Sequence, residues 1–171
     1  MPIVASDISL RKSGGATNTD PNLALGGAMS TVAGGIIAND VLNNLMDDIS
    51  SAEASSGITI YRGLYWDNEH ATLQYTNPFM FIPSQTSSGD TDLAMAIADE
   101  AKNLAIETIP NETTAPVGPT FSAPASKGAG IAVGSLNAGD NRGFWLRYTV
   151  NAAAAAALDT MTVAIEGDSL P

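Results

Sequence analysis

One stretch of alternating residues near the C-terminal end constrains the fold more than any other feature of the chain. Phe144, Leu146 and Tyr148 alternate with Trp145 and Arg147, directly after a turn rich in Gly, Asp and Asn. A period of two is typical of a strand with one buried face, because successive side chains in a strand point to opposite faces. The pattern predicts that the first three side chains lie in the core. The other two are expected on the opposite face of the sheet.

Further segments carry strand signals and are separated by turn residues. The strand after the alternating stretch is expected to form a closing hairpin with it. A second hairpin is expected from residues 58–66 and their return strand, in which Pro78 predicts a break or bulge because proline cannot donate to a ladder. The predicted strand segments are 6–12 (a short edge strand), 58–66, 71–82, 93–98, 105–109, 131–136 and 161–165.

One short helix is predicted between residues 36 and 49. Apolar residues recur there at i, i+1, i+4, i+5 and i+8, behind a capping residue at Asn39 or Asp40. The alanine run at residues 152–157 favours a helix by propensity, but it lies between two predicted strands. We expect a loop or a single turn there, because isolated short helices are marginally stable.

Residues 13–35 are rich in Gly, Ala, Thr and Asn and have too little periodicity for a regular element. Loops of this length are uncommon inside compact domains, and they are usually functional or become ordered on a partner. A disordered linker is the competing interpretation. We predict an extended N-terminal arm at residues 1–35 and a mainly β domain at residues 36–171. The domain is expected to be an antiparallel β-sandwich, jelly-roll or immunoglobulin-like, and the strand count favours the latter.

The charge of the chain excludes several classes of partner. The formal net charge is −11, and the seven Lys and Arg residues are scattered along the chain. Binding to nucleic acid or to an anionic membrane needs clustered basic residues, so neither partner is expected. The chain has no long apolar run and no signal-peptide pattern at its start, so we expect synthesis in the cytoplasm. The low charged fraction, 15%, suits a subunit whose faces are covered by neighbours.

The sequence predicts no enzyme. His70 is the single histidine and lies in a predicted turn, and no nucleophile elbow or phosphate loop is present. Acidic residues cluster in predicted loops, but none of these clusters matches an EF-hand, so calcium is a minor alternative. We therefore predict no catalytic, cofactor-binding or metal-binding residues and no cofactor.

Several segments together resemble a group of tailed-bacteriophage virion proteins. They include Tyr61-Arg-Gly-Leu-Tyr, Phe144-Trp-Leu-Arg and Val163-Ala-Ile-Glu-Gly-Asp, and the similarity spans nearly the whole chain. The other segments are 13–28, 42–49, 52–54 and 122–124. The resemblance implies a virion structural protein without a catalytic motif.

Within tailed phages, a small acidic sandwich resembles a capsid decoration, or cement, protein. This resemblance implies a homotrimer on the capsid surface of the virion, with the major capsid protein as its partner. A tail or baseplate subunit, possibly one that binds carbohydrate, is the alternative. Our mechanistic hypothesis is that the arm reaches across adjacent subunits while the sandwich projects outward. The residues expected to make these contacts are Ile8, Leu10, Leu23, Leu25, Trp145 and Arg147.

Overall fold

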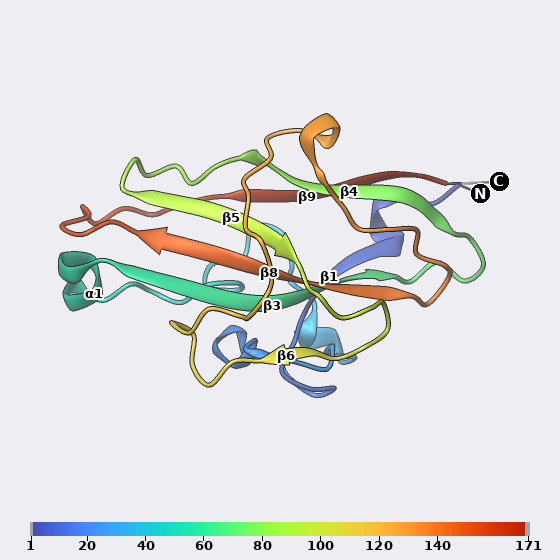
Figure 1. Cartoon of the computed structure of the whole chain (residues 1–171), viewed down its shortest axis with the longest axis horizontal. Helices are drawn as coiled ribbons and strands as arrows, with labels where there is room; N and C mark the ends of the chain where they lie inside the picture. The colour runs from blue at the N-terminus through green and yellow to red at the C-terminus, as the bar shows by residue number, and fades with distance from the viewer. Residues whose placement is uncertain (1, 170–171) are drawn as a thin grey trace.

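A computed structural model describes residues 2–169 of the chain and is mainly β (Figure 1). Its strands form three antiparallel sheets, with the orders β1-β3-β8-β5, β7-β4-β9 and β2-β6. The strands are β1 (Ile8–Lys12), β2 (Gly26–Gly27), β3 (Ile58–Asn68), β4 (Tyr75–Ser84), β5 (Thr91–Ile97), β6 (Ile106–Thr108), β7 (Ile131–Ala132), β8 (Asn141–Val150) and β9 (Thr162–Ser169). The helical elements are α1 (Ser51–Ser56) and the 3-10 turns η1 (Ala5–Asp7), η2 (Pro21–Leu23), η3 (Ala33–Gly35) and η4 (Lys127–Ala129).

The main core contains residues of both larger sheets. Phe144, Leu146 and Tyr148 of β8 all belong to it, which confirms the prediction from their alternation. Trp66 of β3 stacks on Phe144 with ring centroids 5.5 Å apart. The buried members also include Ile60, Leu64, Met80, Ile82, Leu93, Met95, Leu136 and Val150.

A second buried cluster lies on the other face of the four-stranded sheet. Trp145 is fully buried there, together with Tyr65 from the same sheet and Ile106 and Ile109 from the region of β6. Trp145 and Arg147 were predicted to lie on this face, and the alternation of β8 places them there. The burial of Trp145 within its own chain leaves no surface of this side chain for a neighbouring subunit.

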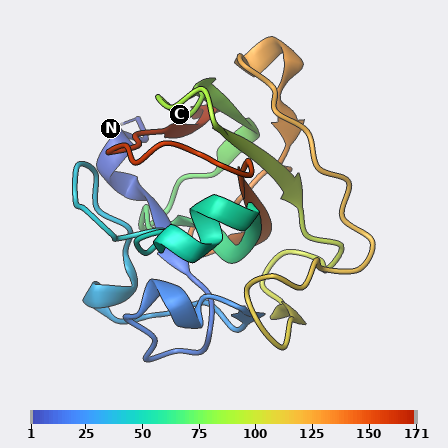
Figure 2. The same cartoon turned by 90° about the vertical axis from the view of Figure 1, so that its left-hand side faces the viewer.

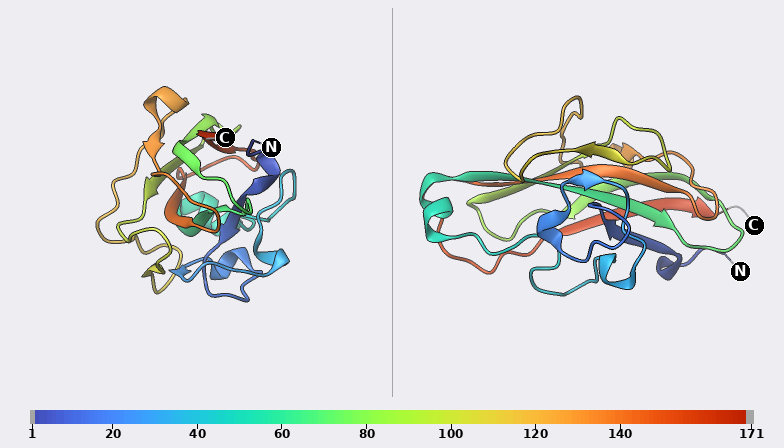
Figure 3. Two further views of the ribbon diagram at one scale, coloured as in Figure 1. Left: turned by 90° about the vertical axis from the view of Figure 1, so that its right-hand side faces the viewer. Right: turned by 90° about the horizontal axis from the view of Figure 1, so that it is seen from below.

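The N-terminal residues cover this second cluster. Figure 3 shows the segment at residues 13–35 lying along the sheet. Backbone bonds hold it there: Gly63 donates to the carbonyl of Ala24 at 2.7 Å, and Ile109 donates to that of Leu25 at 2.9 Å. In the folded chain, then, residues 8–12 form β1 and the following segment is bound to its own sheet. That residues 1–35 reach a neighbouring subunit stays a prediction.

Both predicted hairpins are wrong in their pairing, although their strands exist. β8 pairs with β3 and β5, whereas β9 pairs with β4 in a different sheet. β3 likewise pairs with β1 and β8 and not with the strand that follows it. Periodicity shows which residues form a strand, but it carries no information on the order of strands. The predicted break at Pro78 is confirmed, since the register between β4 and β9 shifts between Thr76 and Phe79.

The predicted helix is also misplaced. Asp40 and Asn43 have positive φ angles of 57° and 55°, so residues 36–49 form turns. Asn and Asp tolerate this left-handed conformation better than other residues with a side chain, and it interrupts a right-handed helix. The helix follows at α1, where Ser50 and Glu53 form a capping box. This Ser-x-x-Glu signal was present in the sequence.

The two long sides of the larger sheets differ. On one side, Ser122 exchanges backbone bonds of 2.8 and 2.9 Å with Met95 of β5, and Pro124 accepts from Ile82 of β4 at 2.7 Å. The extended chain at residues 121–125 therefore links the two sheets. On the opposite side, the edge strands are β1 and β9, which are not paired with each other. The end-on view in Figure 2 shows the blue N-terminal and red C-terminal segments next to each other on this side.

A buried tyrosine on the second face gives a prediction for alkaline pH. The Tyr65 hydroxyl donates to the Gly27 carbonyl at 2.6 Å and accepts from the Ile106 amide at 2.9 Å. Burial raises the pKa of Tyr65 to about 12, although the Ile106 amide favours the ionised form. We expect Tyr65→Phe to lower the free energy of unfolding by about 2 kcal/mol near neutral pH, because two buried backbone groups lose their partner.

The difference between wild type and Tyr65→Phe should depend on pH. The folded pKa lies above the unfolded value near 10, so the contribution of the hydroxyl is complete below about pH 10 and falls as pH rises toward 12. Urea denaturation at several pH values between about 8 and about 11.5 measures this difference. The two free energies of unfolding should converge at the alkaline end. A gap that stays constant over this range would contradict the prediction.

Candidate binding groove between β1 and β9

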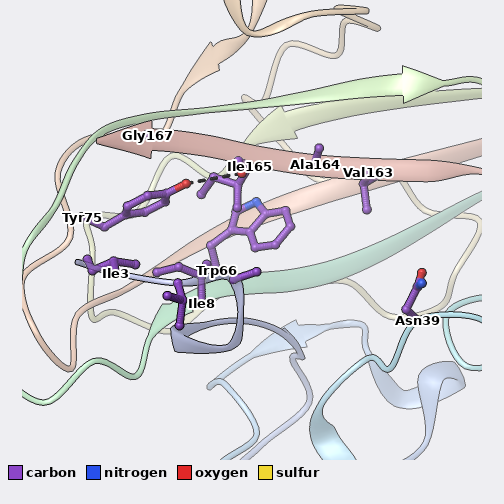
Figure 4. Close-up of a pocket in the computed structure, with 11 residues that line it drawn as sticks. Ile3, Ile8, Asn39, Trp66, Tyr75, Val163, Ala164, Ile165 and Gly167 are labelled. Carbon is purple, nitrogen blue, oxygen red and sulfur yellow. Dashed lines mark hydrogen bonds between the residues drawn. The ribbon is translucent and has the colours of Figure 1, made fainter. Parts of the chain in front are cut away.

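An open groove of about 570 Å³ lies between the edge strands β1 and β9 (Figure 4). Its walls are apolar side chains from β1, β3, β4 and β9, and the residues before β1 form part of its rim. The lining residues are Ile3, Val4, Ala5, Ile8, Asn39, Trp66, Tyr75, Val163, Ala164, Ile165 and Gly167. Its volume lies in the range of ligand-binding clefts, and polar as well as apolar atoms form its exposed surface.

Trp66 provides the most informative polar atom of the groove. The residue lies on β3 opposite Leu10 of β1, and it is only 5% exposed. Its indole Nε1 is buried and has no hydrogen-bond partner within residues 2–169. Figure 4 shows this nitrogen on the side of the ring that faces β9. Because an unpaired buried donor costs about 1–3 kcal/mol, an acceptor placed in the groove would be favoured.

Tyr75 supplies a second polar group at the inner wall. Its hydroxyl donates to the carbonyl oxygen of Ile165 on β9 at 3.3 Å, which is long for a hydroxyl donor. Burial raises the pKa of Tyr75, the Gly167 amide opposes this rise, and the charges of Glu166 and Asp168 add to it. The hydroxyl therefore stays protonated and acts as a donor at neutral pH.

The strand β9 separates apolar and acidic side chains. Val163 and Ile165 are half-buried and pack on the main core. Glu166 and Asp168 lie on the outer face and are exposed. Lys127 of η4 approaches these two carboxylates at 3.3 and 4.0 Å. The outer face of this edge strand is therefore acidic, while the inner face is apolar.

A charged network fixes β1 at the other rim. Arg11 forms ion pairs with Asp67 at 2.9 Å and with Glu69, which also accepts from the Ser9 hydroxyl at 2.6 Å. Burial raises the pKa of Asp67 despite the charge of Arg11. Burial alone would raise the pKa of Glu69 too, but the bonds from Ser9 and Arg11 outweigh it and lower that pKa. The network ties β1 to the end of β3, so this rim of the groove is held in place.

The residues predicted from sequence to make contacts are scattered over the molecule. Ile8 lines the groove, and Leu10 packs on the main core beside it. Leu23 is exposed, whereas Leu25 packs on the second cluster with the buried Trp145. The guanidinium of Arg147 lies 5.2 Å from the ring centroid of Phe121 on that same face. The structure therefore brings only Ile8 and Leu10 together near the groove.

Sequence reasoning missed Trp66, Tyr75 and Ile165 as groove residues. All three lie in segments that the alternation identified as strands, but their juxtaposition depends on the strand order. His70 has a structural role, since its Nδ1 accepts from the backbone amides of Thr72 and Leu73 at 3.1 and 2.9 Å. Within residues 2–169, His, Cys, Asp and Glu side chains form no group of three that could hold a metal ion.

Comparison with known proteins found no matching family model, no similar curated protein and no similar solved structure. No helix within residues 2–169 has the length and apolar character to cross a membrane.

Proposed function

We propose that the chain is a non-enzymatic structural subunit of a tailed-phage particle, and that it decorates and stabilises the capsid shell by binding across subunits of the major capsid protein. In this proposal the four-stranded and three-stranded sheets are the two layers of a β-sandwich. The assembled form is a homotrimer on the outer surface of the virion. The protein acts through binding and needs no cofactor.

The groove between β1 and β9 is the observation that carries this proposal. A subunit that clamps a shell must hold part of a neighbouring chain, and an edge strand beside an apolar groove is suited to bind an extended segment. An enzyme site would need reactive side chains in the groove, whereas its walls are mainly Ile, Val, Trp and Tyr. Large exposed apolar side chains elsewhere also suit a subunit covered by neighbours, including Leu42, Val117 and Leu158.

The location and copy number of the protein in purified particles test this proposal. Quantitative mass spectrometry should find it in an amount comparable with that of the major capsid protein. Purified protein should also bind to shells that lack it. A far smaller amount, confined to isolated tails, would favour a tail or baseplate subunit. Absence from the particle would refute a virion role.

A further inference from the structure

The groove lies on the side of the molecule where no segment of residues 2–169 bonds to both larger sheets. On the other side, residues 121–125 run between the edges of β5 and β4 and bond to both. Within residues 2–169, no corresponding segment bonds to both β1 and β9. Residues 36–37 bond to the outer edge of β1, where Ile37 donates to Leu10 at 2.8 Å. The position left for a further extended segment is therefore the outer edge of β9.

We propose that the groove takes an extended segment of a partner protein, which adds to the outer edge of β9 and carries apolar and basic residues in alternation. The identification of this partner as a neighbouring virion subunit rests on the proposed function. Three parts of the groove determine which segment can bind: the strand edge, the inner wall and the outer face.

The strand edge provides the backbone part of the recognition. β9 has eight residues and pairs only with β4 within the part of the chain described, so its other edge is open to a further strand. An extended peptide can satisfy the backbone groups along such an edge. At Ile165 the carbonyl oxygen now accepts the long bond from Tyr75, and an incoming backbone amide can replace that donor.

The inner wall selects apolar side chains and one acceptor. Side chains of the added strand that point inward meet Ile8, Val163 and Ile165, which favour aliphatic groups of medium size. The unpaired Nε1 of Trp66 lies just beneath this wall, and a small rotation of the side chain would let it donate to an acceptor such as a peptide carbonyl. Removal of this donor should weaken binding about fivefold, the usual effect of one neutral hydrogen bond.

The outer face selects basic side chains. Glu166 and Asp168 are 59% and 76% exposed at their side chains, and residues of an added strand that point outward would lie beside them. Opposite charges on neighbouring strands attract, and like charges repel. Lys127 balances one of the two carboxylates, so this face keeps one net negative charge. That charge favours a basic partner over a second copy of this acidic chain, whose formal net charge is −11.

The two tryptophans allow a matched test in the full-length protein. Trp66 and Trp145 each bury an Nε1 without a partner, but only Trp66 lines the groove. In Trp145→Phe the remaining indole therefore reports on the groove, and in Trp66→Phe it reports on the second cluster. The probe is a labelled eight-residue peptide of alternating Val and Lys, with capped ends, matched in length to β9. Controls are a peptide of the same composition with all Val before all Lys, and an alternating Val/Glu peptide.

We expect the alternating peptide to change the tryptophan emission of Trp145→Phe and to leave that of Trp66→Phe unchanged. Fluorescence anisotropy of the label should show about fivefold weaker binding to Trp66→Phe than to Trp145→Phe. The exposed double change Glu166→Gln with Asp168→Asn, which leaves the core untouched, should weaken binding about threefold. Asp92→Asn, at an exposed position on β5, should not weaken it.

Several outcomes would overturn the inference. The first is that the alternating peptide does not bind. The second is that the control peptide with all Val before all Lys binds as tightly as the alternating one. The third is that Trp66→Phe and Trp145→Phe bind the alternating peptide with equal affinity. Dimerisation that depends on protein concentration and is not inhibited by the peptide would assign the groove to a second copy. The proposed function is tested separately by the particle measurements. If the protein binds the peptide but is absent from particles, only the proposed function is refuted. If the protein is a shell component but its peptide binding does not change in Trp66→Phe or in the double change at Glu166 and Asp168, only this inference is refuted.

Discussion

Arg62→Ala is expected to lower the free energy of unfolding by about 3 kcal/mol, because a large, fully buried side chain is lost together with its hydrogen bonds to two partly exposed carboxylates. The Arg62 side chain is fully buried. Its guanidinium forms ion pairs with Glu112 at 2.6 Å and Asp47 at 3.2 Å, and it donates to Asn22 at 3.1 Å. The substitution would leave a cavity and two carboxylates without their counter-ion. Urea denaturation, with the slope m compared between variants, measures the loss.

Arg147→Ala is the control at a second arginine of the same sheet, one residue along β8 from the partner of Arg62 and on the opposite face. Its guanidinium packs over the ring of Phe121 and forms no ion pair within residues 2–169. The expected loss is below about 1 kcal/mol, which is typical of an exposed cation–π contact. Equal losses for Arg62→Ala and Arg147→Ala would contradict the role assigned to the buried arginine.

Arg62 also connects three irregular segments that are far apart in the sequence. Asn22 belongs to the N-terminal segment, Asp47 to the turns before α1 and Glu112 to the loop after β6. The first and third segments have no regular period, and the helical period of the second did not predict its position. This contact joins the three segments in addition to the backbone bonds of the first and third to β3, and composition carries no signal of such long-range contacts.

The strands could be predicted because each one shows its own local alternation of apolar and polar residues. In β8 the apolar residues at alternate positions face the main core, and the alternation is visible in the sequence. β5 and β6 are likewise confirmed close to their predicted segments, and Pro78 marks the irregular part of β4. The mainly β fold followed from these local patterns.

The groove could not be predicted because it depends on contacts between distant segments. Trp66 and Ile165 belong to strands of different sheets, and a local hairpin is the simplest expectation for strands that follow each other along the chain. Trp145 shows the same difficulty at the level of one residue. The prediction that Trp145 lies on the second face was correct. The sequence of the loops that bury it does not show that they cover that face.

A pair of neighbouring glycines gives the second large effect and tests how the N-terminal segment is held. Gly26 and Gly27 both have positive φ, at 94° and 80°. A Cβ at Gly26 would overlap the backbone carbonyl of Glu107, whereas at Gly27 its nearest neighbour would be the Thr108 hydroxyl at 3.6 Å. We expect Gly27→Ala to lower the free energy of unfolding by about 1–2 kcal/mol, the cost of the left-handed conformation alone. Gly26→Ala should lower it by at least about 3 kcal/mol, because β2 must also move away from β6.

Hydrogen exchange in Gly26→Ala distinguishes a segment that belongs to the fold from a detachable arm. The amides of Gly63 and Ile109 donate to the N-terminal segment, so their exchange reports on its release. Because that segment covers the buried Trp145 cluster, we expect exchange at β8 to accelerate together with these amides and urea stability to fall. Faster exchange confined to Gly63 and Ile109, with unchanged urea stability, would contradict this expectation. It would mean that the segment can leave its own sheet at little cost, as an arm that binds a neighbouring subunit must do.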